Sequence, residues 1–148
     1  MSDYFIRFIP ENIDTKLKWD EMKQIEKISW NGNSPKIIIN EKIQFADTGQ
    51  NFETVRCPFC KSNLMEWWGN AMSSACSKER GFIELEITTP CCNMTTSLHC
   101  LDYSFPQGFY KTMIEVIPEI GSQVFAERIA NDLFNITGGA WRIIYAYY

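Results

Sequence analysis

The stretch that decides the fold begins with Cys57-Pro58-Phe59-Cys60 and is completed by Thr88-Thr89-Pro90-Cys91-Cys92. A C-x-x-C turn presents two thiolates to one metal ion, and zinc prefers a tetrahedron of soft ligands. The second stretch repeats the first, because Thr89-Pro90-Cys91-Cys92 places Cys92 where Cys60 stands. We therefore predict a structural zinc ion held by Cys57, Cys60, Cys91 and Cys92. A site closed by four protein ligands leaves no position for a reacting water.

The adjacency of Cys91 and Cys92 leaves other ligand sets open. Neighbouring side chains point to opposite faces of a strand, so both thiolates reach one ion only if the turn is distorted. His99, the only histidine, or Cys100 could replace one of them, since imidazole with three thiolates is a normal zinc set. Burial as simple apolar side chains, or a redox role, suits the proline-containing C-x-x-C turn less well.

The composition is that of an ordinary globular protein. The chain has 148 residues, 45% hydrophobic and 22% charged, which is enough apolar material for a core without disulfides. Its formal net charge is −4, and its 14 basic side chains are scattered along the sequence. A nucleic-acid-binding surface normally requires clustered Lys and Arg, so this distribution argues against nucleic acid as a partner.

The first residues do not resemble a secretion signal, because Asp3, Arg7 and Pro10 interrupt the apolar run. No segment approaches the roughly 18 consecutive apolar residues of a membrane-spanning helix. We therefore expect a cytoplasmic protein without a membrane partner. In a reducing compartment, six cysteines indicate metal binding before disulfides.

Hydrophobic periodicity divides the chain into two similar outer parts and an insert. The outer elements are expected as strands at 4–9, 37–40 and 42–46, a helix capped by Asp14 and closed by Asn31-Gly32, a strand at 109–117, a helix ended by Thr137-Gly138-Gly139, and a strand at 141–148. Two such β-α-β units make an α+β fold, the ferredoxin-like split βαβ sandwich, in which two helices cover one face of an antiparallel sheet.

The insert has a different pattern. A helix is expected with Leu64, Trp68 and Met72 on one stripe, followed by a hairpin of strands 82–89 and 95–101 with the second cysteine pair at its tip. We therefore predict a first half of the sandwich at 1–54, a zinc-ribbon insert at 55–102, and the second half of the same domain at 103–148.

Several of these motifs resemble a group of uncharacterised bacterial zinc-ribbon proteins. They are Cys57-Pro58-x-Cys60, Trp67-Trp68 with Met72, Thr88-Thr89-Pro90-Cys91-Cys92, Thr96-Ser97-Leu98, Leu101-Asp102-Tyr103, Pro106-Gln107-Gly108-Phe109 and the tail Arg142-Ile143-Ile144-Tyr145-Ala146-Tyr147-Tyr148. The resemblance implies Cys91 and Cys92 as the ligand pair, because the group has polar, non-ligand residues in place of His99-Cys100. A glycine usually follows each cysteine pair in that group, whereas this chain has Lys61 and Asn93. The resemblance implies no particular activity.

These observations favour a non-enzymatic protein-interaction module whose zinc ribbon is a rigid platform for a protein partner or a second copy of the chain. One alternative is a small enzyme with a cleft between ribbon and sandwich, which requires polar residues with shifted pKa values facing an open pocket. Another is nucleic-acid binding through the ribbon, which requires a basic face. Adjacent His99 and Cys100 point to opposite faces of a strand, so they do not make a nucleophile and base.

Three further features have two interpretations each. Trp67 and Trp68 diverge by about 100° on a helix, so one indole can be an exposed contact, or both can pack over the hairpin. Glu84 and Glu86 share one strand face, and we interpret them as its solvated side rather than a catalytic pair. The aromatic stretch 102–110 either fills the gap between ribbon and sheet or forms a recognition surface.

Overall fold

The structure is a computed structural model, and it describes residues 3–77, 79–118 and 123–148. Its helices are α1 (Trp19–Glu26), α2 (Met65–Ala75) and α3 (Gln123–Thr137), with a 3-10 helix, η1, at Leu98–Cys100. Its strands are β1 (Tyr4–Pro10), β2 (Lys36–Ala46), β3 (Val55–Arg56), β4 (Cys76–Ser77), β5 (Gly81–Phe82), β6 (Glu86–Thr88), β7 (Thr95–Ser97), β8 (Asp102–Tyr103), β9 (Gly108–Val116) and β10 (Trp141–Tyr147). Helices combined with antiparallel sheets confirm the predicted α+β class.

Six strands form the main sheet in the order β10-β1-β9-β2-β5-β4, with antiparallel neighbours throughout. β1 is interior, because Phe8 lies opposite Ile143 of β10 on one side and Ile114 of β9 on the other. The β2–β9 ladder shifts register between Ile39 and Gln44. The two short strands predicted at 37–40 and 42–46 are therefore one irregular strand.

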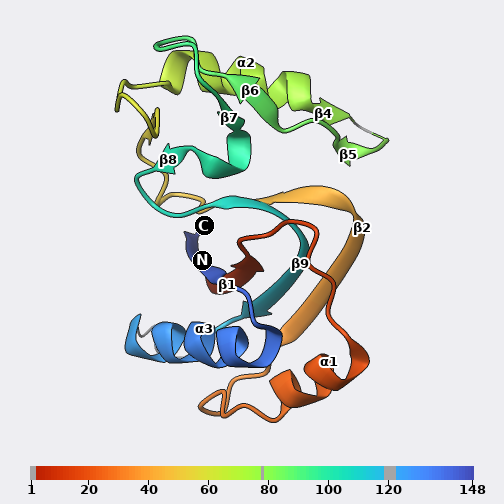
Figure 1. Cartoon of the computed structure of the whole chain (residues 1–148). Helices are drawn as coiled ribbons and strands as arrows, with labels where there is room; N and C mark the ends of the chain where they lie inside the picture. The colour runs from red at the N-terminus through yellow and green to blue at the C-terminus, as the bar shows by residue number, and fades with distance from the viewer. Residues whose placement is uncertain (1–2, 78, 119–122) are drawn as a thin grey trace.

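The larger core lies between this sheet and the helices α1 and α3, which Figure 1 shows together on one side of the molecule. The inward residues of α3 recur at helical spacing, and those of the sheet alternate along β1 and β9. Fully or almost fully buried members are Ile6, Phe8, Ile25, Trp30, Ile114, Val116, Phe125, Ala126, Ile129 and Leu133. The 3.6-residue and two-residue periods of the sequence thus correspond to one packed interface.

The helix predicted to be capped by Asp14 begins later, at Trp19. Lys18 precedes its first turn, and the carboxylate of Glu21 accepts a hydrogen bond of 2.8 Å from the Lys18 amide. Asp14 instead forms an ion pair of 3.3 Å with Lys111 of β9. A tertiary contact thus uses the carboxylate that the sequence pattern assigned to the helix end.

The insert occupies the end of the molecule opposite α1 and α3 (Figure 1). β3 and β8 pair where it begins and ends, and β6 pairs with β7. Its core combines aliphatic and aromatic side chains and also includes side chains of the main sheet; its aromatic members are Phe45, Phe52, Trp67, Trp68, Phe82, Tyr103 and Phe109. The predicted hairpin is shorter than expected, because Phe82 pairs with Ile43 of the main sheet and residues 98–100 form η1.

Candidate metal centre

The first cysteine pair lies in a tight turn directly after β3. Within this turn, the amide of Lys61 donates to the carbonyl of Cys57 at 3.0 Å, and the amide of Cys57 donates to the carbonyl of Ser62 at 2.9 Å. Lys61 has a φ of 63°, which lies in the left-handed region. This region is energetically unfavourable for a residue that has a Cβ.

The second cysteine pair lies in a turn with the same hydrogen-bond pattern, between β6 and β7. The amide of Asn93 donates to the carbonyl of Thr89 at 2.9 Å, and the amide of Thr89 donates to the carbonyl of Met94 at 2.8 Å. Asn93 has a φ of 59°, matching Lys61. Thr89 therefore occupies the position of Cys57, and Cys92 that of Cys60. We refer to residues 57–62 and 89–94 as the first and second knuckle.

The two knuckles bring the four predicted cysteines together. The Sγ atoms of Cys57 and Cys92 lie 3.6 Å apart, and those of Cys60 and Cys91 lie 3.3 Å apart. All four Sγ atoms lie within 4.8 Å of one another, so the group could hold a metal ion. Cys91 and Cys92 both reach the cluster, with Sγ atoms 3.9 Å apart, because they lie in a turn rather than in a strand with alternating side chains.

Two hydroxyl groups complete this cluster, and neither was among the site residues predicted from the sequence. Oγ of Ser62 lies 3.2 Å from Sγ of Cys60, and Oγ1 of Thr89 lies 3.3 Å from Sγ of Cys92. Thr89 Oγ1 already accepts the Met94 amide at 3.0 Å, so its proton is available to a thiolate. The match between the two knuckle sequences was the available signal for Thr89, since it aligns with a cysteine.

The cluster perturbs the ionisation of its own thiols. Hydrogen bonds from the side chain and backbone of Ser62 lower the pKa of Cys60 to about 6, and a contact with Cys91 contributes. Desolvation and the neighbouring thiols, Cys60 first, raise the pKa of Cys91 to about 12. Ionising one thiol therefore makes ionisation of the next more costly. A bound cation would relieve this conflict, because it favours the thiolate form of every ligand.

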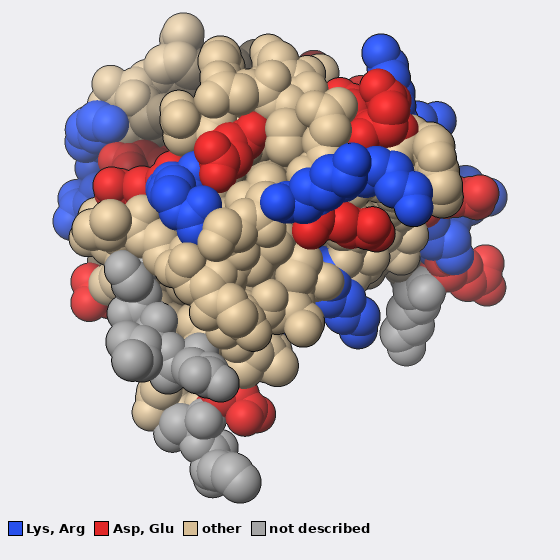
Figure 2. Space-filling model, turned by 90° about the horizontal axis from the view of Figure 1, so that it is seen from below, with Lys and Arg blue, Asp and Glu red and all other residues tan. Residues whose placement is uncertain are grey.

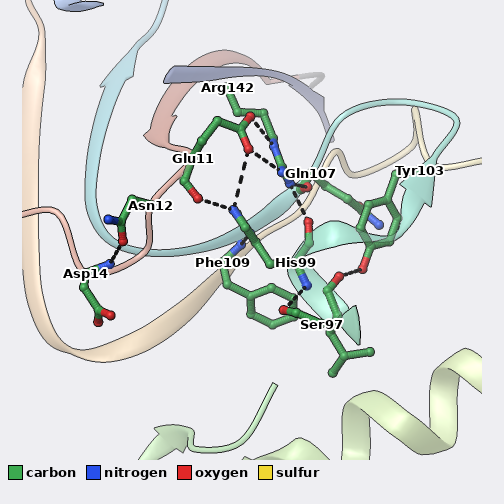
Figure 3. A network of polar contacts seen from close by, with 10 residues as sticks. Glu11, Asn12, Asp14, Ser97, His99, Tyr103, Gln107, Phe109 and Arg142 are labelled. Carbon is green, nitrogen blue, oxygen red and sulfur yellow. Dashed lines mark hydrogen bonds and ion pairs between the residues drawn. The ribbon is translucent and has the colours of Figure 1, made fainter. Parts of the chain in front are cut away.

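The alternative ligands His99 and Cys100 lie outside this four-cysteine group. His99 is buried in η1, whereas Cys100 is exposed. Figure 3 shows His99 among residues of the main sheet and the β1–α1 connection. The Phe109 amide donates to its Nδ1 at 3.0 Å, so Nε2 carries the proton and donates to the Glu11 carbonyl, also at 3.0 Å. Both ring nitrogens are thus engaged away from the thiols.

The network around His99 is ionic as well as buried. Arg142 donates from Nε and Nη2 to the two carboxylate oxygens of Glu11, at 2.9 and 2.7 Å, and from Nη1 to the carbonyls of His99 and Gln107 (Figure 3). Desolvation lowers the pKa of His99 to about 4, and the charge of Arg142 acts in the same direction against the weaker influence of Glu11. His99 is therefore a neutral structural residue at pH 7.

The tryptophan pair, Tyr103 and Phe109 fill the junction between insert and sheet, whereas Phe105 is exposed. Trp68 stacks on Phe52 with ring centroids 5.2 Å apart and donates from Nε1 to the Tyr103 hydroxyl at 3.2 Å. Trp67 is half-buried against the same core. Phe109 is completely buried in this junction. None of the helices in the described ranges has the length and apolar character needed to span a membrane.

Fold and site together define the class: an α+β chain with a four-cysteine cluster able to hold a metal ion. Comparisons with protein-family models, with curated proteins and with solved structures gave no match.

Proposed function

We propose that this chain is a non-enzymatic protein-interaction module stabilised by a structural Zn²⁺ ion, with Cys57, Cys60, Cys91 and Cys92 as ligands. The placement of four Sγ atoms within 4.8 Å carries the proposal. Zn–S bonds of about 2.3 Å at tetrahedral angles separate the sulfurs by about 3.8 Å. The closest pairs, at 3.3, 3.6 and 3.9 Å, bracket that value.

Zinc suits this site better than a hard cation, because all four donors are thiols. With four protein ligands the ion has no open position, so its contribution is to folding rather than to chemistry. The two knuckles come from opposite ends of the insert, and the ion would join them where Cys60 and Cys91 are exposed and contribute little packing.

We further propose that the scaffold is a ferredoxin-like sandwich with this zinc ribbon inserted between its halves, 1–54 and 103–148. The strand order β10-β1-β9-β2 supports it, since the split βαβ arrangement places its four strands in the order 4-1-3-2. α1 connects β1 to β2, and α3 connects β9 to β10, as two βαβ units require.

The catalytic alternative requires an open polar cleft between insert and sheet. That junction is packed with aromatic side chains: Phe45, Phe82 and Phe109 form ring pairs with centroids 4.9 to 6.3 Å apart. This packing favours an interaction role, with a protein partner or a second copy of the chain.

All six cysteines are free thiols, which is consistent with our proposal of a reducing, cytoplasmic location.

Nucleic-acid binding is disfavoured by charge. The net charge is −4, and Figure 2 shows Lys and Arg interspersed with Asp and Glu on the face it presents. Ion pairs such as that of Lys61, in the first knuckle, with Asp102 neutralise basic side chains locally. A phosphate backbone binds best to a continuous basic surface, and the face shown in Figure 2 does not present one.

Native mass spectrometry with and without a strong chelator tests the proposal, with circular dichroism on the same samples. We expect one zinc per chain and loss of structure on chelation. Cys60→Ala should lose the ion, whereas Cys76→Ala, the matched exposed cysteine outside the cluster, should keep it. A folded chain without metal, or one that forms a Cys57–Cys60 disulfide, would overturn the zinc proposal. The same spectra report self-association.

A further inference from the structure

A groove of about 370 Å³ runs between α2 and β6. Its lining includes Trp67, Ala71 and Ala75 of α2, and Glu84, Glu86 and Ile87 from the β6 side. The three α2 residues are four positions apart, so they share one face of the helix. With Ile87 they give the groove an apolar floor, of which the half-buried indole of Trp67 is the largest part.

The charged side chains that line the groove in the described part of the chain, Glu84 and Glu86, are both acidic. Glu84 and Glu86 are exposed, and neither forms an ion pair with a described residue. The Glu86 amide donates to the Glu84 carboxylate at 2.9 Å, which holds that carboxylate near the strand. No basic residue lines the groove in the described part of the chain.

The backbone of β6 adds a third feature. β6 pairs only with β7 in its two-stranded sheet, so its outer edge has no partner strand among the described residues. Consecutive residues 86–88 all line the groove, which means that the groove meets the strand at its edge rather than on one face. Unpaired strand edges are templates for an added extended segment.

We propose that this groove binds an extended, positively charged segment of a protein partner. A Lys or Arg of that segment would place its cation between the Glu84 and Glu86 carboxylates and over the Trp67 indole. Its aliphatic stem would cover Ile87 and the two alanines. The proposal rests on the interaction role proposed above and specifies the chemistry of the partner.

The test uses zinc-supplemented, ¹⁵N-labelled full-length protein and two capped eight-residue peptides, one alternating Lys with Thr and the other Glu with Thr. The readout is the indole N–H signal of Trp67, assigned by its loss in Trp67→Phe. We expect the lysine peptide, and not the glutamate peptide, to shift this signal. The double variant Glu84→Gln with Glu86→Gln should weaken binding by at least about tenfold, because two charged partners are lost.

The matched control is Glu26→Gln with Glu53→Gln, which removes the same charge from exposed positions outside the groove. It should change the affinity by less than about twofold, since distant surface charges are screened. Equal weakening by both double variants, or no shift with the lysine peptide, would overturn the proposal. If the folded, zinc-loaded protein does not bind the lysine peptide, only the proposal for the groove is refuted. If the protein folds without metal, the proposed structural zinc site is refuted.

Discussion

Gly108 decides how closely three segments of the chain approach one another. A Cβ at this position would lie 2.5 Å from Nη1 of Arg142 and 2.8 Å from both Cε1 and Nδ1 of His99. The imidazole cannot move away without losing the hydrogen bond from the Phe109 amide. We expect Gly108→Ala to lower the free energy of unfolding by about 1–3 kcal/mol, as overpacking does elsewhere. Urea denaturation of the zinc-loaded protein measures the change.

Gly69 provides the matched control for this substitution. It lies inside α2, and a Cβ there would meet nothing within 4 Å. Alanine is the better helix former, so Gly69→Ala should raise the free energy of unfolding by up to about 1 kcal/mol. If Gly108→Ala were as stable as the unmodified chain, the close packing of Gly108 against Arg142 and His99 would be contradicted.

At the scale of elements, the equivalence of the two knuckles makes a sharper prediction. Thr89 is 1% exposed and takes the backbone position of Cys57, the buried member of the proposed ligand set. Cys91→Ser should weaken zinc binding beyond the roughly 10–100-fold lost with an outer-shell partner, because a direct ligand is removed. Adding Thr89→Cys should restore most of the affinity, because it recreates the first knuckle in the second.

Competition with a chromophoric chelator measures these zinc affinities. Thr89→Cys alone serves as the control, since it leaves all four original cysteines in place. The double variant could bind zinc no better than Cys91→Ser. That result would show that the side chain at position 89 does not point toward the cluster as Cys57 does, despite the shared backbone hydrogen-bond pattern.

The same elements show what local sequence can predict. The cysteine turns, the outer strands and α2 could be predicted, because each depends on a short hydrophobic period or on a turn motif. The strand partner of Phe82 could not be predicted. Its ring packs on Phe109 and Phe45, with centroids 4.9 and 6.3 Å away, and this long-range contact draws β5 into the main sheet. Likewise, 131 residues separate Glu11 from Arg142, so no local pattern relates them.

For the candidate site, the sequence named the four cysteines but left His99 and Cys100 as alternatives. That ambiguity exists because neighbouring side chains alternate if Cys91 and Cys92 lie in a strand. The structure places both in a turn, where the left-handed Asn93 redirects the backbone. Asn93 itself was the local sign of such a turn, because asparagine adopts this conformation more readily than most residues.

At the scale of the whole molecule, the His99 network joins all three parts of the chain. His99 belongs to the insert, Glu11 follows β1, and Arg142 lies in β10 (Figure 3). The imidazole is neutral in the folded state, with a pKa of about 4 against a reference of 6.5. As the pH falls below 6.5, the imidazole therefore takes up a proton in the unfolded chain but stays neutral in the folded chain. The folded state loses stability from pH 6.5 down to about pH 4.

Between pH 7 and pH 5 this linkage should lower the free energy of unfolding by about 2 kcal/mol. Arg142 outweighs the effect of burial and lowers the pKa of Glu11 below its usual 4.5, so the stabilisation from Glu11 is lost only at lower pH and does not confuse this interval. Protonation of the thiols would release the proposed zinc ion within the same interval. Comparison with His99→Gln, which keeps all four ligands, cancels that contribution and should show a drop smaller by about 2 kcal/mol.

A direct measurement is available because His99 is the only histidine in the chain. Its Cε1–H signal in an NMR titration belongs to one residue without assignment, and we expect it to stay unchanged from pH 7.5 to pH 5. A midpoint near 6.5 would mean that the imidazole is solvated and that the insert is not held to the sheet through this network. A midpoint near 4 would establish that burial against Arg142 keeps it neutral, and would tie the position of the insert to both outer halves.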